Sequence, residues 1–190
     1  MNTADLGLPV DVPSTALFTD HYELTMLQAA LKGGTADRRS VFEVFTRRLP
    51  EGRRYGVVAG TGRVLDAVEN FRFDADVIGF LRERNVVDEP TLEWLASYRF
   101  GGDVWGYPEG EVYFAGSPVL RVEGSFAECV LLETVILSIL NHDSAIAAAA
   151  SRMASAAGGR PLIEMGARRT HELAAVAASR ANLPRSATLS

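Results

Sequence analysis

One long helical pattern, which begins at Ser125 and ends at Gly158, sets the main limit on the fold of this sequence. Ser125 and Glu128 have the spacing of a capping box, in which two side chains satisfy free N–H groups at a helix start. The most apolar stretch of the chain, residues 129–140, lies inside this pattern and covers only 12 residues. A membrane helix needs about 20 apolar residues, so we expect a helix buried in a protein core and no membrane segment.

The composition is that of a folded globular protein. The chain has 190 residues, of which 47% are hydrophobic and 23% charged, so it suits one large domain or a domain with part of a second. The net charge is −5 and no block of Lys and Arg stands out, so nucleic-acid binding is not indicated. Cys129 is the single cysteine, which excludes an internal disulfide and a cysteine zinc cluster and fits a reducing cytoplasm.

Residues 15–124 predict a mixed α/β domain, and residues 1–14, which lack the features of a signal peptide, predict a flexible arm. A helix begins at Asp20, with Glu23 at capping-box spacing, and ends at the glycines that follow residue 32. A strand over residues 40–47, a turn at Pro50 and a second strand over 55–59 predict an antiparallel pair. Three short helices and then several short strands are expected over residues 61–71, 74–84, 88–98 and 101–124.

A strand and a helix are expected after the long helix. Residues 161–166 form a short apolar run typical of a buried parallel strand, and residues 167–181 resume helical periodicity. This order is that of the first unit of an α/β barrel or sheet. Residues 182–190 are polar and interrupted by proline, so an irregular tail is expected there.

The loop between this strand and helix is the first candidate site, with Arg168, Arg169, Thr170 and His171. Ligands of α/β folds collect where strands end, and guanidinium groups bind carboxylate or phosphate through two parallel hydrogen bonds. A helix N-terminus adds partial positive charge, so the loop suits an anionic ligand. A pair of surface arginines bridging to nearby glutamates explains the pattern equally well.

The second candidate site is the start of the first helix. Tyr22 stands in its first turn, where an aromatic ring can stack on a flat ligand while its hydroxyl stays in water. The alternative is that Tyr22 and Met26 are core residues and that Asp20 only caps the helix. The pattern alone favours this alternative.

Four blocks occur in an order and spacing that resemble the nicotinate phosphoribosyltransferases: TDHYELTM, SVFEVFTRRLP, LLETVILSILN leading into SAIAAAASRM, and PLIEMGARRTHE. The resemblance covers roughly residues 15–181. It implies an α/β protein in which an α+β N-terminal domain, residues 15–124, leads into the first unit of an irregular α/β barrel, residues 125–181. It also implies a homodimer that builds each active site from both subunits.

The function that this resemblance implies is the joining of nicotinate to phosphoribosyl pyrophosphate, driven by ATP, to give nicotinate mononucleotide for NAD biosynthesis. Mg²⁺ would accompany the pyrophosphate. By the same resemblance, Tyr22 stacks on the pyridine ring in the partner subunit's site, and Arg168 and Arg169 line the substrate pocket. Asp20, Thr170 and His171 complete the expected substrate-binding residues.

One motif of the resembled family does not occur in this sequence. The family carries a G-T-x-x-H motif whose histidine is phosphorylated by ATP, and none of His21, His142 and His171 lies in such a motif. We therefore expect no catalytic residue and no metal ligand in this chain, a satisfied polar role for His142, and a tail that reflects truncation or a frameshift. The alternatives are a non-catalytic fragment that only dimerises or binds, and the sister nicotinamide or quinolinate phosphoribosyltransferases. TDHYELTM and EMGARRTHE favour the nicotinate branch.

Overall fold

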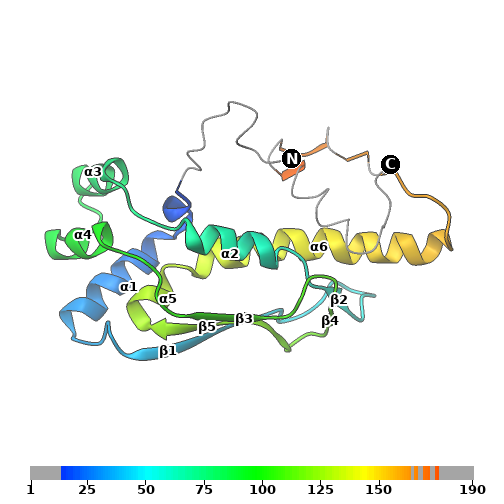
Figure 1. Cartoon of the computed structure of the whole chain (residues 1–190), viewed down its shortest axis with the longest axis horizontal. Coiled ribbons are helices and arrows are strands. Elements are labelled where there is room, and N and C mark those ends of the chain that lie inside the picture. Colours follow the sequence, from blue (N-terminus) through cyan, green and yellow to red (C-terminus); the bar gives the residue numbers. More distant parts are fainter. Residues whose placement is uncertain (1–13, 164, 167–168, 172–173, 176–190) are drawn as a thin grey trace.

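The computed structural model describes residues 14–163, 165–166, 169–171 and 174–175. Helices cover one face of an antiparallel sheet whose strand order is β1-β5-β3 (Figure 1). The sheet strands are β1 (Arg39–Phe45), β3 (Asp103–Gly106) and β5 (Pro118–Ser125), and a second small sheet pairs β2 (Gly56–Val57) with β4 (Val112–Tyr113). The helices of the described residues are η2 (Ala16–Phe18), α1 (His21–Lys32), α2 (Thr61–Glu69), α3 (Ala75–Glu83), α4 (Glu89–Ala96), α5 (Phe126–Val130) and α6 (Glu133–Ala157).

The expected helix α1 and the three short helices α2 to α4 are confirmed. Side-chain caps determine where α1, α3 and α4 begin, whereas α2 begins after Gly60 without a side-chain cap. The Asp74 side chain accepts the Val77 N–H at 2.9 Å at the start of α3. Asp88 does the same for α4, accepting the Thr91 N–H at 3.2 Å. Each cap satisfies a backbone donor that has no partner inside its own helix.

An aromatic cluster forms the centre of the core. The rings of Phe71, Phe73 and Tyr98 meet edge to face, with centroid separations of 5.6 to 6.1 Å. The Tyr98 hydroxyl donates to the Glu128 carbonyl at 3.0 Å, so the buried ring has a partner for its polar atom. The cluster therefore joins the end of α2 and the segment after α4 to α5.

The expected pairing of the first two strands is wrong. β1 pairs antiparallel with β5, with Phe42 opposite Val122, and β2 pairs with β4 instead. The turn at Pro50 does form, with the Arg53 N–H donating to the Pro50 carbonyl at 3.0 Å. The alternating inward side chains of β1 match the buried face of β5, and this burial outweighs the local preference for a hairpin.

The long helix expected from Ser125 is divided in two. α5 ends at Val130, and α6 begins after Leu131 and Leu132, both of which are 0% exposed. The Thr134 N–H at the start of α6 donates to Glu23 Oε1 at 3.0 Å, a contact with a distant segment that no local signal predicts. Burial of the two leucines and this external partner explain the break.

The expected strand over residues 161–166 does not form in its described part, residues 161–163 and 165–166. A parallel strand needs a neighbour to pair its N–H and C=O groups, and the described residues supply none beside it. Its apolar side chains are instead exposed, with Ile163 at 84% and Met165 at 69%. Of the helix expected over residues 167–181, residues 169–171 and 174–175 are described, and of these only 174–175 are α-helical. Arg168, residues 1–13 of the expected arm and the tail 182–190 lie outside the described residues.

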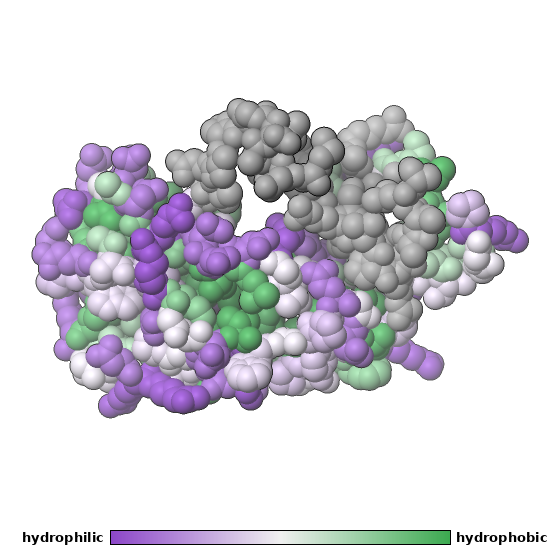
Figure 2. Space-filling model, viewed as in Figure 1, coloured by the Kyte–Doolittle hydropathy of each residue, from purple (hydrophilic) through white to green (hydrophobic). Residues whose placement is uncertain are grey.

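Apolar groups are also exposed between α2 and β3. Figure 2 shows a hydrophobic patch in the middle of this face with hydrophilic residues around it. Leu65 of α2, which is 48% exposed, lines a groove there together with Val68 and Val104. No helix in the described part of the chain is long and apolar enough to cross a membrane.

Candidate functional site

The two sequence-predicted residues of the first helix, Asp20 and Tyr22, lie together at the start of α1. Asp20 is the N-cap residue, and Tyr22 is 46% exposed in the first turn. Met26, one turn further, is 42% exposed. The alternative that placed Tyr22 and Met26 in the core is therefore wrong, and the ring of Tyr22 is available to a ligand.

A buried carboxylate supports this end of the helix. Glu23 is 0% exposed, and its Oε1 accepts the Thr134 N–H at 3.0 Å and the Thr134 hydroxyl at 2.6 Å. Its Oε2 accepts the Asp20 N–H at 3.1 Å and the hydroxyl of Thr19. We call these four residues, Thr19, Asp20, Glu23 and Thr134, the Glu23 junction. Burial nevertheless raises the pKa of Glu23, partly offset by these hydrogen bonds.

The surroundings of Tyr22 are acidic. Partial burial and the carboxylates of Glu133, Glu23 and Asp20 raise the pKa of Tyr22 to about 12. The phenol therefore stays neutral at physiological pH and offers a hydroxyl and an aromatic face. The negative neighbours do not attract an anion, so the side chain suits stacking rather than charge recognition.

A cavity of about 770 Å³ lies beside the Glu23 junction, between α2 and α6. Thr134 and His142 of α6, Arg63 of α2 and His171 contribute to its wall. The Thr134 hydroxyl oxygen also lies 3.1 Å from Asp20 Oδ2, so the structure brings the predicted residue His171 to the same region as Asp20. We call this space the α2–α6 cavity.

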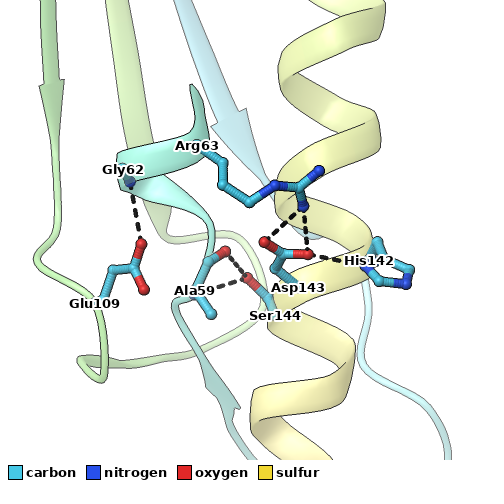
Figure 3. A network of polar contacts seen from close by, with 7 residues as sticks. All are labelled: Ala59, Gly62, Arg63, Glu109, His142, Asp143 and Ser144. Carbon is cyan, nitrogen blue, oxygen red and sulfur yellow. Dashed lines mark hydrogen bonds and ion pairs between the residues drawn. The ribbon is translucent and has the colours of Figure 1, made fainter. Parts of the chain in front are cut away.

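A polar network fixes α2 against the middle of α6 (Figure 3). Both carboxylate oxygens of Asp143 accept from Arg63 Nη1 at 2.8 Å, and the Asp143 side chain is only 2% exposed. His142 Nδ1 lies 2.8 Å from Asp143 Oδ1, which confirms the expected satisfied polar role of His142. Ser144 exchanges hydrogen bonds of 3.2 Å with the N–H and the carbonyl of Ala59. The network therefore joins the β2–α2 connection to α6.

The remaining predicted residues are only partly described. Arg169 and Thr170 are exposed, and the Arg169 N–H closes a turn by donating to the Gly166 carbonyl at 2.7 Å. Of Arg169, Thr170 and His171, His171 alone lines the α2–α6 cavity. Arg168 and the two glutamates suggested as its partners lie outside the described residues.

A basic groove, which the sequence analysis did not identify, lies at the other end of the sheet. It has a volume of about 510 Å³ and is lined by Arg47, Arg48 and Arg53 with Tyr55 and Tyr113. Among the described residues, no ion pair engages any of these three arginines. Four arginines within eight residues, at positions 47, 48, 53 and 54, are the signal that could have revealed it. Unpaired guanidinium groups around a groove suit phosphate or carboxylate.

Metal ligands do not cluster in the described residues, which contain no group of three or more His, Cys, Asp or Glu side chains placed to hold a metal ion. The arrangement therefore consists of an exposed tyrosine in acidic surroundings, a cavity that reaches His171, and a separate basic groove.

Comparison with known sequences places this geometry in context. Residues 17–141 match the model of the nicotinate phosphoribosyltransferase N-terminal domain. Nicotinate phosphoribosyltransferase pncB1 of Mycobacterium tuberculosis is 65% identical over 175 residues, which cover 92% of this chain and 39% of the relative. Nicotinate phosphoribosyltransferase of Bacillus subtilis is 34% identical over 160 residues, or 84% of this chain and 33% of that protein. The chain thus spans about two fifths of the length of the first of these relatives and one third of the second.

Solved structures agree with the sequence comparison. The crystal structure of human nicotinic acid phosphoribosyltransferase superposes with a TM-score of 0.73 at 32% identity, covering 80% of this chain and 31% of the human chain. The nicotinate-nucleotide pyrophosphorylase from Pyrococcus furiosus gives a TM-score of 0.69 at 25% identity and covers 92% of this chain and 37% of the other. The mixed α/β fold described above is therefore shared with enzymes of pyridine nucleotide metabolism.

Proposed function

The chain belongs to the nicotinate phosphoribosyltransferase family, and from this premise we propose that the complete protein carrying it joins nicotinate to phosphoribosyl pyrophosphate. ATP would drive the reaction, which gives nicotinate mononucleotide and pyrophosphate for NAD biosynthesis. The observation that carries the proposal is the family match over residues 17–141, which includes the segment around Tyr22.

The role of Tyr22 in this proposal is to stack on the pyridine ring. Its ring is 46% exposed, whereas Asp20 and Glu133 beside it are negative and would not attract the carboxylate of nicotinate. That carboxylate needs cationic partners, and we assign them to Arg168 and Arg169 of the loop after residue 166. In a homodimer, Tyr22 of one subunit would reach the partner subunit's site and stack on the pyridine ring whose carboxylate the arginines bind.

The basic groove is our candidate for the phosphate groups of phosphoribosyl pyrophosphate. Arg47 and Arg48 are exposed and Arg53 is half-buried, so all three can reach a ligand that enters the groove. Planar guanidinium groups bind phosphate oxygens in pairs and stabilise the charge that develops on departing pyrophosphate. Mg²⁺ bound to the pyrophosphate oxygens would neutralise further charge.

A cytoplasmic location is part of the proposal. Cys129 is a buried free thiol in the described structure, as expected of a protein kept in a reducing compartment.

Steady-state kinetics on the complete protein tests this assignment. We expect Tyr22→Ala to raise the KM for nicotinate, since the stacking face is lost, while Tyr22→Phe has little effect. Arg47→Ala should raise the KM for phosphoribosyl pyrophosphate by roughly tenfold or more, since one charge-assisted contact contributes about 1.5–3 kcal/mol. Arg84→Ala, at the end of α3 and outside the groove, is the matched control.

The outcome also separates the alternatives. Turnover with nicotinamide or quinolinate in place of nicotinate would assign the chain to a sister activity. Absence of turnover by the 190-residue chain alone, with a cooperative unfolding transition retained and turnover by the complete protein, would favour the non-catalytic fragment.

A further inference from the structure

The Glu23 junction connects two helix starts that are far apart in the sequence. Thr134 lies 111 residues after Glu23, yet both its N–H and its hydroxyl donate to the Glu23 carboxylate. The N-cap residue of α6, Leu132, makes no side-chain cap hydrogen bond. Glu23 therefore supplies from α1 the acceptor that a local cap residue would normally provide to α6.

This connection bears on the position of Tyr22 relative to α6. Tyr22 precedes Glu23 on α1, and Glu133, whose carboxylate lies beside the Tyr22 phenol, precedes Thr134 on α6. The spacing between Tyr22 and Glu133 thus follows from the hydrogen bonds between their sequence neighbours. On the same junction, the Asp20 N–H donates to Glu23, and Asp20 Oδ2 lies 3.1 Å from the Thr134 hydroxyl oxygen, whose single proton faces the closer Glu23 Oε1.

A buried carboxylate is a costly way to join two helices. Removing a charge from water is unfavourable, and well-packed hydrophobic residues often stabilise a fold as well or better. What the carboxylate adds is direction, because its two oxygens accept four donors in one geometry. Such a junction is suited to fixing the position of the helix turn that carries a neighbouring ring.

We propose that Glu23 and Thr134 are positioning residues that hold the ring of Tyr22 in the orientation in which it stacks on the pyridine ring of nicotinate. Neither residue touches the substrate in this proposal. The effect on nicotinate binding rests on the proposed function. The effect of Glu23 and Thr134 on the orientation of the Tyr22 ring does not.

The first arm of the test is NMR of the chain labelled with ring-¹³C tyrosine, with the Tyr22 signal assigned by its loss in Tyr22→Phe. Thr134→Val removes the hydroxyl with almost no change in shape, and we expect it to shift or broaden the Tyr22 signal. Thr134→Ser restores the hydroxyl and should leave the signal near its original position. Glu23→Gln puts an amide NH₂ in place of one oxygen, which accepts two of the four donors, so it should also perturb the signal.

The matched control is Thr91→Val. Thr91 is 1% exposed and its hydroxyl donates to the Asp88 carboxylate at 2.5 Å, so its loss removes a comparable hydrogen bond at the start of α4. We expect a lower melting temperature and an unchanged Tyr22 signal. An unchanged Tyr22 signal in both Thr134→Val and Glu23→Gln would overturn the proposal, as would an equal shift in Thr91→Val.

The second arm is steady-state kinetics of the same variants in the complete protein. We expect Thr134→Val to raise the KM for nicotinate about fivefold to tenfold with little change in the KM for phosphoribosyl pyrophosphate, and Thr134→Ser to recover most of the loss. A perturbed Tyr22 signal with an unchanged KM for nicotinate would overturn the positioning role while leaving the proposed function intact. A wild-type protein without turnover, combined with the expected NMR shifts, would refute the proposed function and leave the structural part standing.

Discussion

The buried ion pair of Arg63 and Asp143 makes a quantitative prediction about stability. Asp143→Asn keeps the shape of the side chain but removes its charge and puts an NH₂ group opposite the Arg63 guanidinium. The two 2.8 Å contacts from Arg63 Nη1 then cannot both persist. Breaking a buried pair by removing one partner costs about 3–5 kcal/mol.

The expected cost is smaller here, because the two partners differ in exposure. The Asp143 side chain is 2% exposed, whereas the Arg63 side chain is 35% exposed and can recover part of its hydration when the carboxylate is lost. We therefore expect Asp143→Asn to lower the free energy of unfolding by about 2–3 kcal/mol. For a chain of this length, that corresponds to a fall in melting temperature of roughly 5–10 °C.

Thermal and urea unfolding followed by circular dichroism would measure this, as a cycle with Arg63→Met and the double variant. We expect a coupling energy of about 1–3 kcal/mol between the two sites. Arg82→Met is the control, because Arg82 and Glu89 form a pair at 2.5 Å with both side chains about half exposed, and its loss should leave the melting temperature unchanged. A coupling energy below about 0.5 kcal/mol would refute the view that this pair fixes α2 on α6.

Three further predictions follow from single positions. Gly60→Ala should cost about 1–3 kcal/mol, because φ is +98° and an added Cβ would lie 3.0 Å from Asp143 Oδ2, whereas Gly79→Ala, with nothing within 4 Å, should not destabilise. Burial raises the pKa of Glu23 in the folded state above its ordinary value. The free energy of unfolding of the wild type should therefore fall as pH rises through the folded-state pKa. Urea unfolding at a series of pH values would measure this, and Glu23→Gln should not show the fall. In the complete protein, Arg168→Ala should reduce kcat/KM roughly tenfold to more than a hundredfold, and Arg168→Lys should recover only part; wild-type efficiency at an unchanged melting temperature would remove Arg168 from the substrate pocket.

The local sequence alone determined most of the helices. Asp20, Asp74, Asp88 and Ser125 are helix caps in the structure, at the positions where their spacing to the next residues predicts them. The glycines at 158 and 159 end α6 in left-handed backbone, as glycine readily does. These signals act within one helical turn, so they depend little on distant segments.

The candidate site was only partly accessible from the sequence. The residue pattern around Tyr22 favoured a core position, and only the family resemblance assigned Tyr22 to a ligand; the structure exposes its ring. The sequence analysis identified neither Thr134 nor the basic groove. Thr134 has the pattern of an ordinary helical residue. The arginines lie around the turn between β1 and β2, and these two strands pair with β5 and β4 instead of with each other. Arg168 lies outside the described residues, so its role stays a prediction.

Which distant segments meet depends on the packing of the whole fold. The pairing of β1 with β5, the hydrogen bonds of Glu23 with Thr134 and the contact of Arg63 with Asp143 join residues separated by more than 70 positions. Such contacts depend on which apolar faces are buried together, and a carboxylate such as Glu23 or Asp143 is placed in the interior only when that packing has brought its donors within reach. The sequence contains the donors and acceptors, but burial selects which of them become partners.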